Sequence, residues 1–339
     1  MAITIKDVAK YAEVSPATVS RVIADHPKIS PKTKRRVRKV MEELGYYPNF
    51  QARNLVAQKS KAIGVIMENS TTLAFQNPFF PEVLRGISVS AHQSQYGLYL
   101  STSATETEIY EEVVAMTQGK RVDGIILLYS KTGDKVMDYL LENDVPFSVV
   151  GRPYIQPEAI SFVDNDNVEI SKQVVHHLIT LGHRNISFVG GASDFIVSAD
   201  RLNGYKQGLK EAGIPFTANY VVTQEMMEGR EKQAIQQLME QENPPTAIVT
   251  HDDLVAYEVI SYLEDLDIAV PSDVSIIGFN NHTLSSHLKP PLSTVDISIF
   301  DLGVEAANLV LEKIKDDKAA PRNIIVPATL IERGSCQNL

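Results

Sequence analysis

Short apolar runs recur along the chain from residue 62 onward, and amphipathic stretches of helical length separate most of them. The apolar runs are AIGVIM (62–67), YGLYLS (96–101), GIILLY (124–129), FSVVG (147–151), ISFVG (186–190), AIVT (247–250) and VSIIGF (274–279). The amphipathic stretches span residues 79–95, 106–119, 134–143, 167–181, 198–212, 228–241 and 252–266. Strands that are apolar on both faces and alternate with helices are typical of parallel sheets with helices on both sides. The pattern therefore predicts a doubly wound α/β fold.

These repeating units extend over too many residues for one small sheet. We therefore expect two similar lobes with a break near residue 160, although no sequence repeat, low-complexity segment or long linker marks the boundary. In doubly wound sheets, ligands bind beyond the carboxyl ends of the strands. Between two lobes that edge becomes a cleft, so the sequence predicts a ligand site there.

The head of the chain follows a different, all-helical pattern. Thr4 is a predicted N-cap, with Asp7 as the acidic partner of a capping box. Ser15–Pro16 combines a cap with a proline at the first helical position, and Ser30–Pro31 repeats this signal. The third helix should end at Leu44–Gly45. Two short helices joined by a tight turn and followed by a third predict a helix-turn-helix unit.

Charge is distributed unevenly along the chain. Residues 1–60 contain 12 Lys and Arg against 5 Asp and Glu, a net charge of +7, while the whole chain carries −10 and residues 61–339 therefore −17. A basic head on an acidic protein indicates nucleic-acid binding at one end. The basic run of the third helix belongs either to this DNA-binding surface or to an ordinary solvated helix face. It consists of Lys32, Lys34, Arg35, Arg36, Arg38 and Lys39.

Composition limits the remaining classes of protein. A chain of 339 residues with 44% apolar content can bury a large core in two or three domains. The single cysteine, Cys336, excludes a disulfide framework and a cysteine metal site within one chain. No run of eighteen apolar residues occurs, and the N-terminus lacks the apolar stretch of a signal peptide. We therefore expect a soluble cytoplasmic protein without membrane contact.

No catalytic constellation is recognisable in the sequence. Gly190–Gly191 lacks the spaced glycines of a dinucleotide-binding loop, and the adjacent His176 and His177 point in different directions on a helix. No Ser, His and Asp set stands in a nucleophile context. The sequence therefore predicts a protein that is not an enzyme and uses no metal or cofactor.

Six segments, taken in order, resemble the LacI (lactose repressor) family of bacterial transcription regulators. They are TIKDVAKYAEVSPATVSRVI, YYPNFQARNL, NPFFPEVLRGI, LGHRNISFVGG, DRLNGYKQGL and VPSDVSIIGFNNHTLSSHLKPPLSTV. The resemblance covers the whole chain and rests on the order and spacing of these segments. It implies a helix-turn-helix headpiece, a hinge helix, and an effector-binding core like a periplasmic sugar-binding protein.

The resemblance also implies domain boundaries. We expect a headpiece over 1–48, a hinge helix over 49–60, an N-terminal lobe from 61–160 with 293–320, and a C-terminal lobe from 161–292 with 321–339. The chain of such a core crosses between the lobes three times. A helix from about 298 to 316 should therefore return to the N-terminal lobe, and the tail should finish in the other.

The headpiece residues have distinct expected roles on DNA. Ser15 and Thr18, as early hydroxyls of the recognition helix, suit phosphate contacts. In the family pattern Pro16, Ala17 and Arg21 face base edges, where Arg21 can pair bidentately with guanine. Val19 and Val22 should pack inward, while Tyr11 is either core or a phosphate donor. The expected DNA contacts are Thr4, Ser15, Pro16, Ala17, Thr18, Ser20, Arg21, Ser30, Asn49, Arg53 and Leu55.

The hinge carries a separate prediction. Asn49 can cap a helix over 50–57, but a helix of two turns is not stable alone in water. In the family the leucine matching Leu55 wedges into the minor groove at the operator centre. The alternative is that Leu55 packs against its own core. Two hinge helices side by side imply a homodimer and a palindromic double-stranded operator.

The expected effector pocket follows the strand ends. Arg201 matches the family arginine that clamps effector hydroxyls or carboxylates. His251 and Asp252 match a pair that is often Asn-Asp, and Asn280 stands where Asp is usual. His251 and Asn280 still form hydrogen bonds without charge, so a polyol ligand fits.

Aromatic residues near the same strand ends have two possible roles. They either stack on sugar rings or belong to the core, and they are Phe79, Tyr129, Phe162, Phe195 and Phe279. Arg152 and Asp164, where the chain crosses between lobes, are either ligand contacts or a hinge ion pair. The expected effector contacts are Phe79, Tyr129, Arg152, Asp164, Phe195, Arg201, His251, Asp252 and Asn280.

The sequence leaves several alternatives to a maltose-responsive repressor. A sugar-transport protein would share the core but begin with a signal peptide, and a Rossmann-type enzyme would need a phosphate loop where MENSTTLAFQNPFF stands. Within the family, overall similarity is strongest to maltose-operon repressors of Gram-positive bacteria, which implies maltose or a maltodextrin as effector. The alternatives are a catabolite-control regulator with a phosphoprotein co-repressor, and a repressor that responds to another sugar or a purine.

Overall fold

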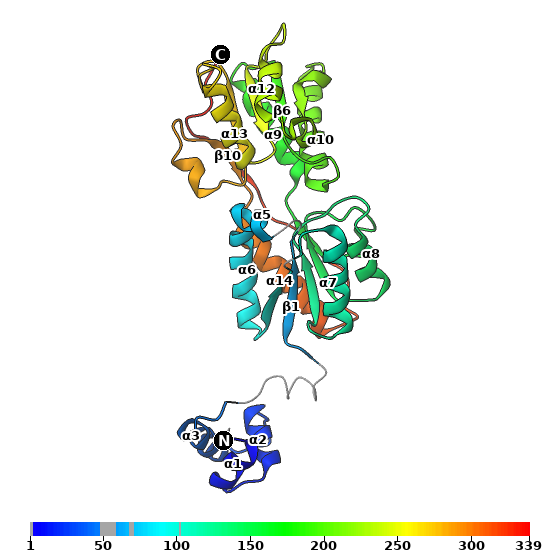
Figure 1. Cartoon of the computed structure of the whole chain (residues 1–339), viewed down its shortest axis with the longest axis vertical. Helices are drawn as coiled ribbons and strands as arrows, with labels where there is room; N and C mark the ends of the chain where they lie inside the picture. Colours follow the sequence, from blue (N-terminus) through cyan, green and yellow to red (C-terminus); the bar gives the residue numbers. More distant parts are fainter. Residues whose placement is uncertain (1–2, 48–58, 68–70, 102) are drawn as a thin grey trace. The chain divides into compact units, whose positions relative to one another are not determined.

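A computed structural model provides the structure of this chain, and it describes residues 3–47, 59–67, 71–101 and 103–339 (Figure 1). The chain divides into two compact units, residues 1–60 and residues 61–339. The described part of the first unit that precedes residue 48 is the headpiece, the second unit is the core, and each is described by itself. The predicted hinge helix over 49–60 lies outside the described residues except for its last two positions. No helix within the described ranges has the length and apolar composition needed to cross a bilayer.

The headpiece is a three-helix unit. It comprises α1 (Ile5–Tyr11), α2 (Pro16–Ile23) and α3 (Pro31–Glu43). A small apolar core joins the helices and consists of Val8, Ala9, Ala12, Val19, Val22 and Val37. The inward packing predicted for Val19 and Val22 is confirmed, because neither side chain is exposed.

Local sequence explains where these helices begin and end. The Thr4 backbone N–H donates to Asp7 Oδ2 at 2.9 Å, and the Asp7 N–H donates to Thr4 Oγ1 at 3.4 Å, which completes the predicted capping box. Ser15 Oγ and Ser30 Oγ each accept the backbone N–H three residues on, at 3.2 Å. Gly45, at φ +63°, follows the C-cap of α3 as predicted.

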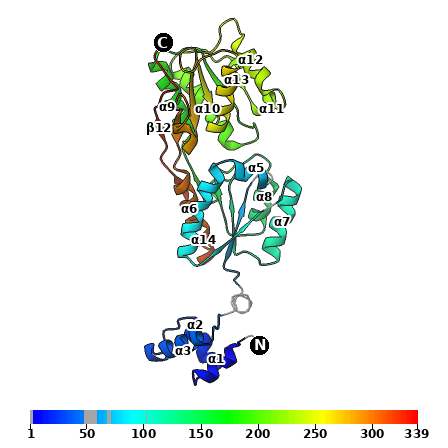
Figure 2. The ribbon, with the colours of Figure 1, turned by 60° about the vertical axis from the view of Figure 1, so that its left-hand side comes forward.

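The first lobe of the core contains a six-stranded parallel sheet in the order β11-β5-β4-β3-β1-β2. Its strands are β1 (Ala62–Ile66), β2 (Gly97–Leu100), β3 (Gly124–Leu127), β4 (Phe147–Val150), β5 (Phe162–Asp164) and β11 (Asn323–Ile325). Its helices are α5 (Thr71–Gln76), α6 (Phe79–Gln93), α7 (Glu106–Gln118), α8 (Lys135–Glu142) and α14 (Ile299–Lys315). Helices α6 and α14 cover one face and α7 and α8 the other, as Figure 2 shows.

The second lobe contains a six-stranded sheet in the order β12-β10-β9-β8-β6-β7, in which β12 runs antiparallel to β10. Its strands are β6 (Ile186–Val189), β7 (Val221–Val222), β8 (Ala247–Thr250), β9 (Ser275–Phe279), β10 (Ser293–Asp296) and β12 (Thr329–Ile331). Its helices are α9 (Asn167–Thr180), α10 (Ile196–Glu211), α11 (Gln224–Met227), α12 (Glu231–Met239) and α13 (Asp253–Glu264), with short 3₁₀ turns at Ala218–Tyr220 and Thr283–Ser286. Helices α9 and α10 pack on one face and α12 and α13 on the other.

The doubly wound α/β class is confirmed, and all seven predicted apolar runs contain a strand. The chain crosses between the lobes after β5, after β10 and after β11. Helix α14 returns to the first lobe as predicted and packs against α6. The predicted lobe boundaries are wrong by a few residues, because β5 and β11 pair in the first sheet and β10 in the second. Each of these short strands ends at a crossing, so only its pairing partner decides its lobe.

Candidate functional site

A cavity lies between the two lobes of the core, at the carboxyl ends of the parallel strands. Segments that follow β3, β4, β5, β8 and β9 contribute to its wall, together with the first turns of α6 and α10. This is the edge at which the sequence predicts a ligand cleft. The lining residues are Asn77, Phe79, Phe80, Leu128, Tyr129, Ser130, Val150, Gly151, Asp164, Asn165, Asn167, Phe195, Val197, Arg201, His251, Asp252, Asn280, Ile297 and Leu302.

Arg201, on α10, is the cation of this cleft, and only 3% of it is exposed. Its Nε donates to Asn167 Oδ1 at 3.0 Å, and its Nη1 donates to the His251 carbonyl oxygen at 2.6 Å. The guanidinium also lies 4.4 Å from the centroid of the Phe279 ring. Burial lowers the pKa of Arg201 to about 10, and the charges of Asp252 and Asp164 oppose that shift. The guanidinium is therefore charged at neutral pH.

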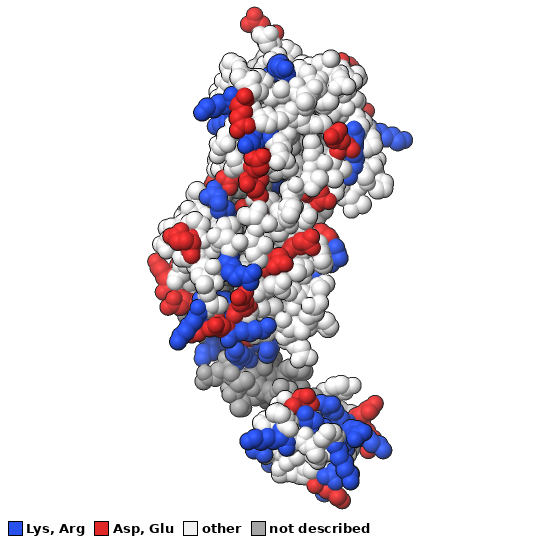
Figure 3. All heavy atoms as spheres, turned by 180° about the vertical axis from the view of Figure 1, so that it is seen from behind, with Lys and Arg blue, Asp and Glu red and all other residues white. Residues whose placement is uncertain are grey.

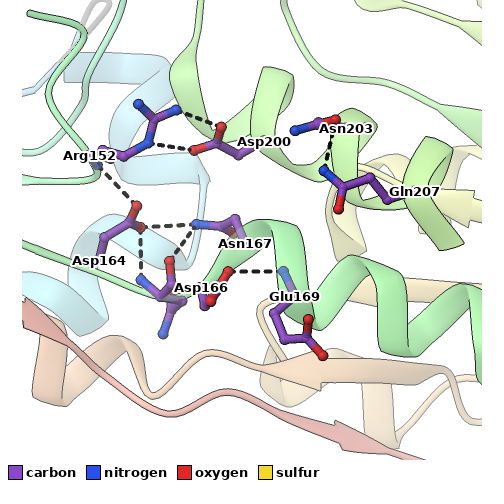
Figure 4. A network of polar contacts seen from close by, with 9 residues as sticks. Arg152, Asp164, Asp166, Asn167, Glu169, Asp200, Asn203 and Gln207 are labelled. Atoms are coloured by element: carbon purple, nitrogen blue, oxygen red, sulfur yellow. Dashed lines mark hydrogen bonds and ion pairs between the residues drawn. The ribbon is translucent and has the colours of Figure 1, made fainter.

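Asp164, at the end of β5, is a buried carboxyl group in the wall of the first lobe (Figure 4). Its Oδ1 accepts the Asn165 N–H at 2.8 Å and the Asn167 side-chain amide at 2.9 Å, and its Oδ2 accepts the Arg152 N–H at 3.0 Å. Burial raises the pKa of Asp164 to about 6, against the effect of these hydrogen bonds. Near neutral pH the group is mostly ionised, but it titrates closer to that range than a surface aspartate does.

Arg152, predicted as an effector contact or a hinge ion pair, forms an ion pair between the lobes. Its Nε donates to Asp200 Oδ2 at 3.1 Å and its Nη2 to Asp200 Oδ1 at 2.6 Å, as Figure 4 shows. The side chain is 45% exposed and is not among the lining residues. The expectation of an effector contact by Arg152 is therefore not supported, because a carboxylate from α10 already engages its guanidinium.

The loops after β8 and β9 add neutral and acidic groups to the wall of the second lobe. Burial lowers the pKa of His251 to about 4, so its imidazole is neutral. Asp252 Oδ1 caps α13 by accepting the Val255 N–H at 2.9 Å. Asn280 has φ +98°, a backbone conformation that asparagine tolerates better than most residues, and its N–H donates to the Val295 carbonyl oxygen at 2.8 Å.

The aromatic candidates separate into two groups. Phe79, Tyr129 and Phe195 line the cleft, together with Phe80, which the sequence reasoning missed. Phe162 and Phe279 belong to the apolar core and do not line the cleft. The cleft therefore presents aromatic rings from α6, from the loop after β3 and from the N-cap of α10.

Asn165 and Asn167 are the polar lining residues that the sequence reasoning missed most clearly. Both follow β5, a strand of three residues that was not predicted. Asn167 Oδ1 accepts a hydrogen bond from Arg201 and so orients its guanidinium. The Asn165 side-chain amide donates hydrogen bonds to the carbonyl oxygens of Ile297 and Val326, which lie at the other two crossings. The signal in the sequence was the polar run Asp164–Asn167 directly after two apolar residues.

In the headpiece, α2 carries the predicted base-reading residues on an exposed surface. Ser15, Pro16, Ala17, Ser20 and Arg21 are exposed and Thr18 is partly exposed, while Thr4 and Ser30 are exposed at the caps of α1 and α3. The two hydroxyls of Ser15 and Thr18 lie 3.0 Å apart. Tyr11 is 66% exposed, so it is not a core residue. Asn49, Arg53 and Leu55 lie outside the described residues.

The basic run of α3 is partly engaged in ion pairs. Asp25 Oδ1 lies 2.9 Å from Lys34 Nζ and 2.7 Å from Arg38 Nη2. Lys32, Arg35, Arg36 and Lys39 are exposed. Lys and Arg side chains gather over the headpiece in Figure 3, which agrees with the charge asymmetry of the sequence.

Each of the two units matches a known protein family. Residues 4–49 match the bacterial regulatory proteins of the lacI family, and residues 175–336 match the periplasmic binding protein-like domain. The chain is 37% identical to the HTH-type transcriptional regulator MalR of Streptococcus pneumoniae, over 94% of each chain. It is 34% identical to catabolite control protein A of Priestia megaterium, over 91% of this chain and 92% of that protein.

A solved structure that covers nearly the whole chain is also that of a transcriptional regulator. The transcriptional regulator CelR–cellobiose complex has a TM-score of 0.77 to this chain at 28% identity, with 98% of this chain and 99% of that chain covered. Two of these relatives over nearly the full length are named transcriptional regulators and the third a control protein, and none of those named here is an enzyme. This chain therefore belongs to the LacI family of bacterial regulatory proteins and is a transcriptional repressor.

Proposed function

We propose that the cleft binds an uncharged sugar, maltose or a maltodextrin, and that this binding changes the affinity of a homodimer for a palindromic operator. The observation that carries the proposal is the composition of the cleft wall. Four aromatic rings, those of Phe79, Phe80, Tyr129 and Phe195, accompany carboxylate, amide and guanidinium groups. Apolar ring faces together with a few polar groups suit the apolar faces and hydroxyls of a sugar.

The charge of the wall supports an uncharged ligand. Two carboxyl groups, Asp164 and Asp252, line the cleft with one guanidinium, that of Arg201. Two donor nitrogens of Arg201 already bond to protein oxygens. A phosphorylated sugar would bring two further negative charges against this wall, which opposes its binding.

The choice of maltose rests on similarity to relatives. The relative named MalR is similar over nearly the whole chain, and the structural neighbour CelR was solved with cellobiose, a disaccharide. Family repressors bind operator DNA and act as dimers. In the dimer proposed here, the exposed face of α2 reads the major groove through Arg21, and two such helices require symmetric half-sites.

Calorimetric titration of the full chain tests the ligand. Maltose and maltotriose should bind, while cellobiose, glucose 6-phosphate and hypoxanthine should bind more weakly or not at all. Flat maltodextrin traces beside a clear signal from another compound would overturn the choice of ligand. A gel shift with palindromic DNA, with and without maltose, tests the control of operator binding.

Similarity to catabolite control protein A favours a second candidate function. In that case a phosphoprotein co-repressor, and no sugar, would set operator affinity. The gel shift separates the two candidates if it includes an arm with a phosphoprotein co-repressor. A response to that protein combined with no response to any sugar would replace the sugar proposal.

A further inference from the structure

We propose that Ser130 binds a hydroxyl group of the effector, and that it makes this contact only while the two lobes are docked as in this structure. The inference rests on the proposed function of the cleft as a sugar site. It adds a specificity-determining residue that the sequence reasoning did not select, and it assigns that residue a part in the coupling between ligand and operator.

Ser130 has a buried hydroxyl without a partner in the wall of the cleft. It stands directly after Tyr129 in the loop that follows β3, lines the cleft, and is 5% exposed. Among the residues that the structure describes, none forms a hydrogen bond with Ser130 Oγ. A buried hydroxyl without a partner costs free energy, and native structures rarely keep one without a reason. A ligand hydroxyl in the cleft would supply the missing partner.

The backbone of Ser130 is bonded to the opposite lobe. The Ile196 N–H donates to the Ser130 carbonyl oxygen at 3.0 Å, and the Thr132 N–H donates to the Asp194 carbonyl oxygen at 2.9 Å. Between them, Lys131 and Phe195 form an antiparallel β-bridge. The loop of the first lobe is thus paired with the segment that leads into α10 of the second. This pairing fixes the position of Ser130, so a ligand held by the second lobe meets Ser130 Oγ only when the pairing is made.

The second lobe has similar neutral groups at and beside His251, which lines the cleft. Ser198 Oγ and His251 Nδ1 have no hydrogen-bond partner within the described part of the chain. Both atoms lie 3.0 Å from the position that a Cβ on Gly191 would occupy, so they converge on one glycine. The Ser130 hydroxyl of the first lobe and the neutral His251 imidazole of the second both line the cleft, and they match sugar hydroxyls, which donate and accept hydrogen bonds at once.

Ser130→Ala, compared with Ser171→Ala, tests the contact. Ser171, on α9, is the matched control, because its hydroxyl is also fully buried and without a partner but does not line the cleft. In calorimetry on the full chain, Ser130→Ala should raise the Kd for maltose by about three- to tenfold, the usual effect of one lost hydrogen bond. Ser171→Ala should leave the Kd unchanged. Equal maltose affinity of Ser130→Ala and the parent would overturn the proposal.

Thermal unfolding without ligand excludes a merely structural role. Because Ser130 Oγ has no partner in the protein, its removal should leave the Tm unchanged or raise it slightly, as should Ser171→Ala. A lower Tm for Ser130→Ala alone would show that the hydroxyl stabilises the free protein, and it would overturn the proposal.

A separate measurement tests whether the contact between Ser130 and the effector requires docked lobes. If Ser130 contacts the effector in one lobe arrangement only, the change in operator affinity caused by saturating maltose should shrink in Ser130→Ala by about the factor that the Kd rises. A raised Kd with the full operator response would overturn this half of the proposal. Failure of the parent to bind any neutral sugar would instead overturn the proposed function, and this inference with it.

Discussion

Arg201 illustrates, at the scale of single residues, how a charge is kept inside the cleft wall. An amide oxygen, a carbonyl oxygen and the face of Phe279 surround the guanidinium. Asp164 and Asp252 supply negative charge nearby. Burying a cation is costly unless such groups replace water. The same partners hold Arg201 in one orientation, which is the condition for recognising a ligand with defined geometry.

The raised pKa of Asp164 predicts a pH-dependent stability. The folded protein keeps the proton up to about pH 6, whereas the unfolded chain releases it near pH 3.8. The unfolded state therefore binds fewer protons in this window, so the contribution of Asp164 is fully present below pH 3.8 and is lost as pH rises to about 6. A shift of this size corresponds to roughly 3 kcal/mol. From pH 4 to pH 7, the free energy of unfolding of Asp164→Asn should therefore rise relative to the parent by about that amount.

Denaturant titration of parent and variant at several pH values measures this difference. The comparison with the parent removes the contributions of all other carboxyl groups. A constant difference across the whole range would show that burial does not shift the titration of Asp164.

Substitution of Arg21 tests how the headpiece recognises the operator sequence. It is exposed on α2, and it adjoins the exposed Ser20. Arg21→Ala should cost about 1–3 kcal/mol at the cognate operator and relax specificity at one base pair. Arg36→Ala, also exposed but on α3, is the control and should weaken binding to all sequences alike. Quantitative gel shifts over operator variants measure both, and uniform weakening by Arg21→Ala would show that it contacts phosphate only.

At the scale of elements, α6 and α14 pack closely because glycines face the partner backbone. A Cβ on Gly303 would lie 2.1 Å from the Val83 carbonyl oxygen, and one on Gly86 would lie 2.1 Å from the Phe300 carbonyl oxygen. No side chain fits at either position unless the helices separate. These two helices come from opposite ends of the core sequence, so the glycines stabilise the return of the chain to the first lobe.

Gly303→Ala should therefore lower the free energy of unfolding by about 3 kcal/mol, since the atoms in its way belong to backbone. Gly97→Ala is the matched control in β2, because its nearest neighbour would be the Lys61 carbonyl oxygen at 3.9 Å. That variant should be neutral or more stable by about 0.5 kcal/mol. Equal stability of the two variants in denaturant unfolding would contradict the close-packing account.

At the scale of the whole molecule, binding at the cleft must reach a DNA-binding unit with its own core. Residues 3–47 are held by an apolar cluster of their own, whereas the lobes are joined by three crossings, the Arg152–Asp200 ion pair and the bridge at Lys131. A ligand that binds both lobes changes their equilibrium by its differential affinity for the two arrangements. We propose that the sequence between the units transmits that change.

Leu55→Ala tests this transmission, and it rests on the family resemblance of YYPNFQARNL. Removal of the minor-groove wedge should weaken specific operator binding by about tenfold or more. The maltose affinity of the free dimer should remain that of the parent, because the residues that line the cleft all come from position 77 onward. Gel shift and calorimetry on the same preparation give both values, and parental operator affinity would show that the hinge plays no part in recognition.

The sequence by itself determined the features that depend on neighbours a few residues apart. Caps at Thr4, Ser15 and Ser30 form local hydrogen bonds, and each of the seven apolar runs contains a strand, although β2 at the sheet edge stays partly exposed. The sequence also placed eight of nine expected effector contacts on the cleft, because residues after parallel strands share one edge. Hydrophobic periodicity and helix capping can be predicted from the sequence because they depend on no long-range contact.

Tertiary structure alone decided the matters that depend on distant partners. Whether β5, β10 and β11 belong to one lobe or the other follows from which strand pairs with each, and short strands carry no such signal. Arg152 does not line the cleft, because its guanidinium forms an ion pair with Asp200. Phe279 belongs to the core, because Arg201 and the apolar residues of the second lobe cover it. Asn165 and Asn167 gain their place in the wall from the crossing after β5, and Ser130 gains its place from the pairing of its loop with the segment before α10. Such contacts join residues tens to hundreds of positions apart, and no local pattern of the chain encodes them.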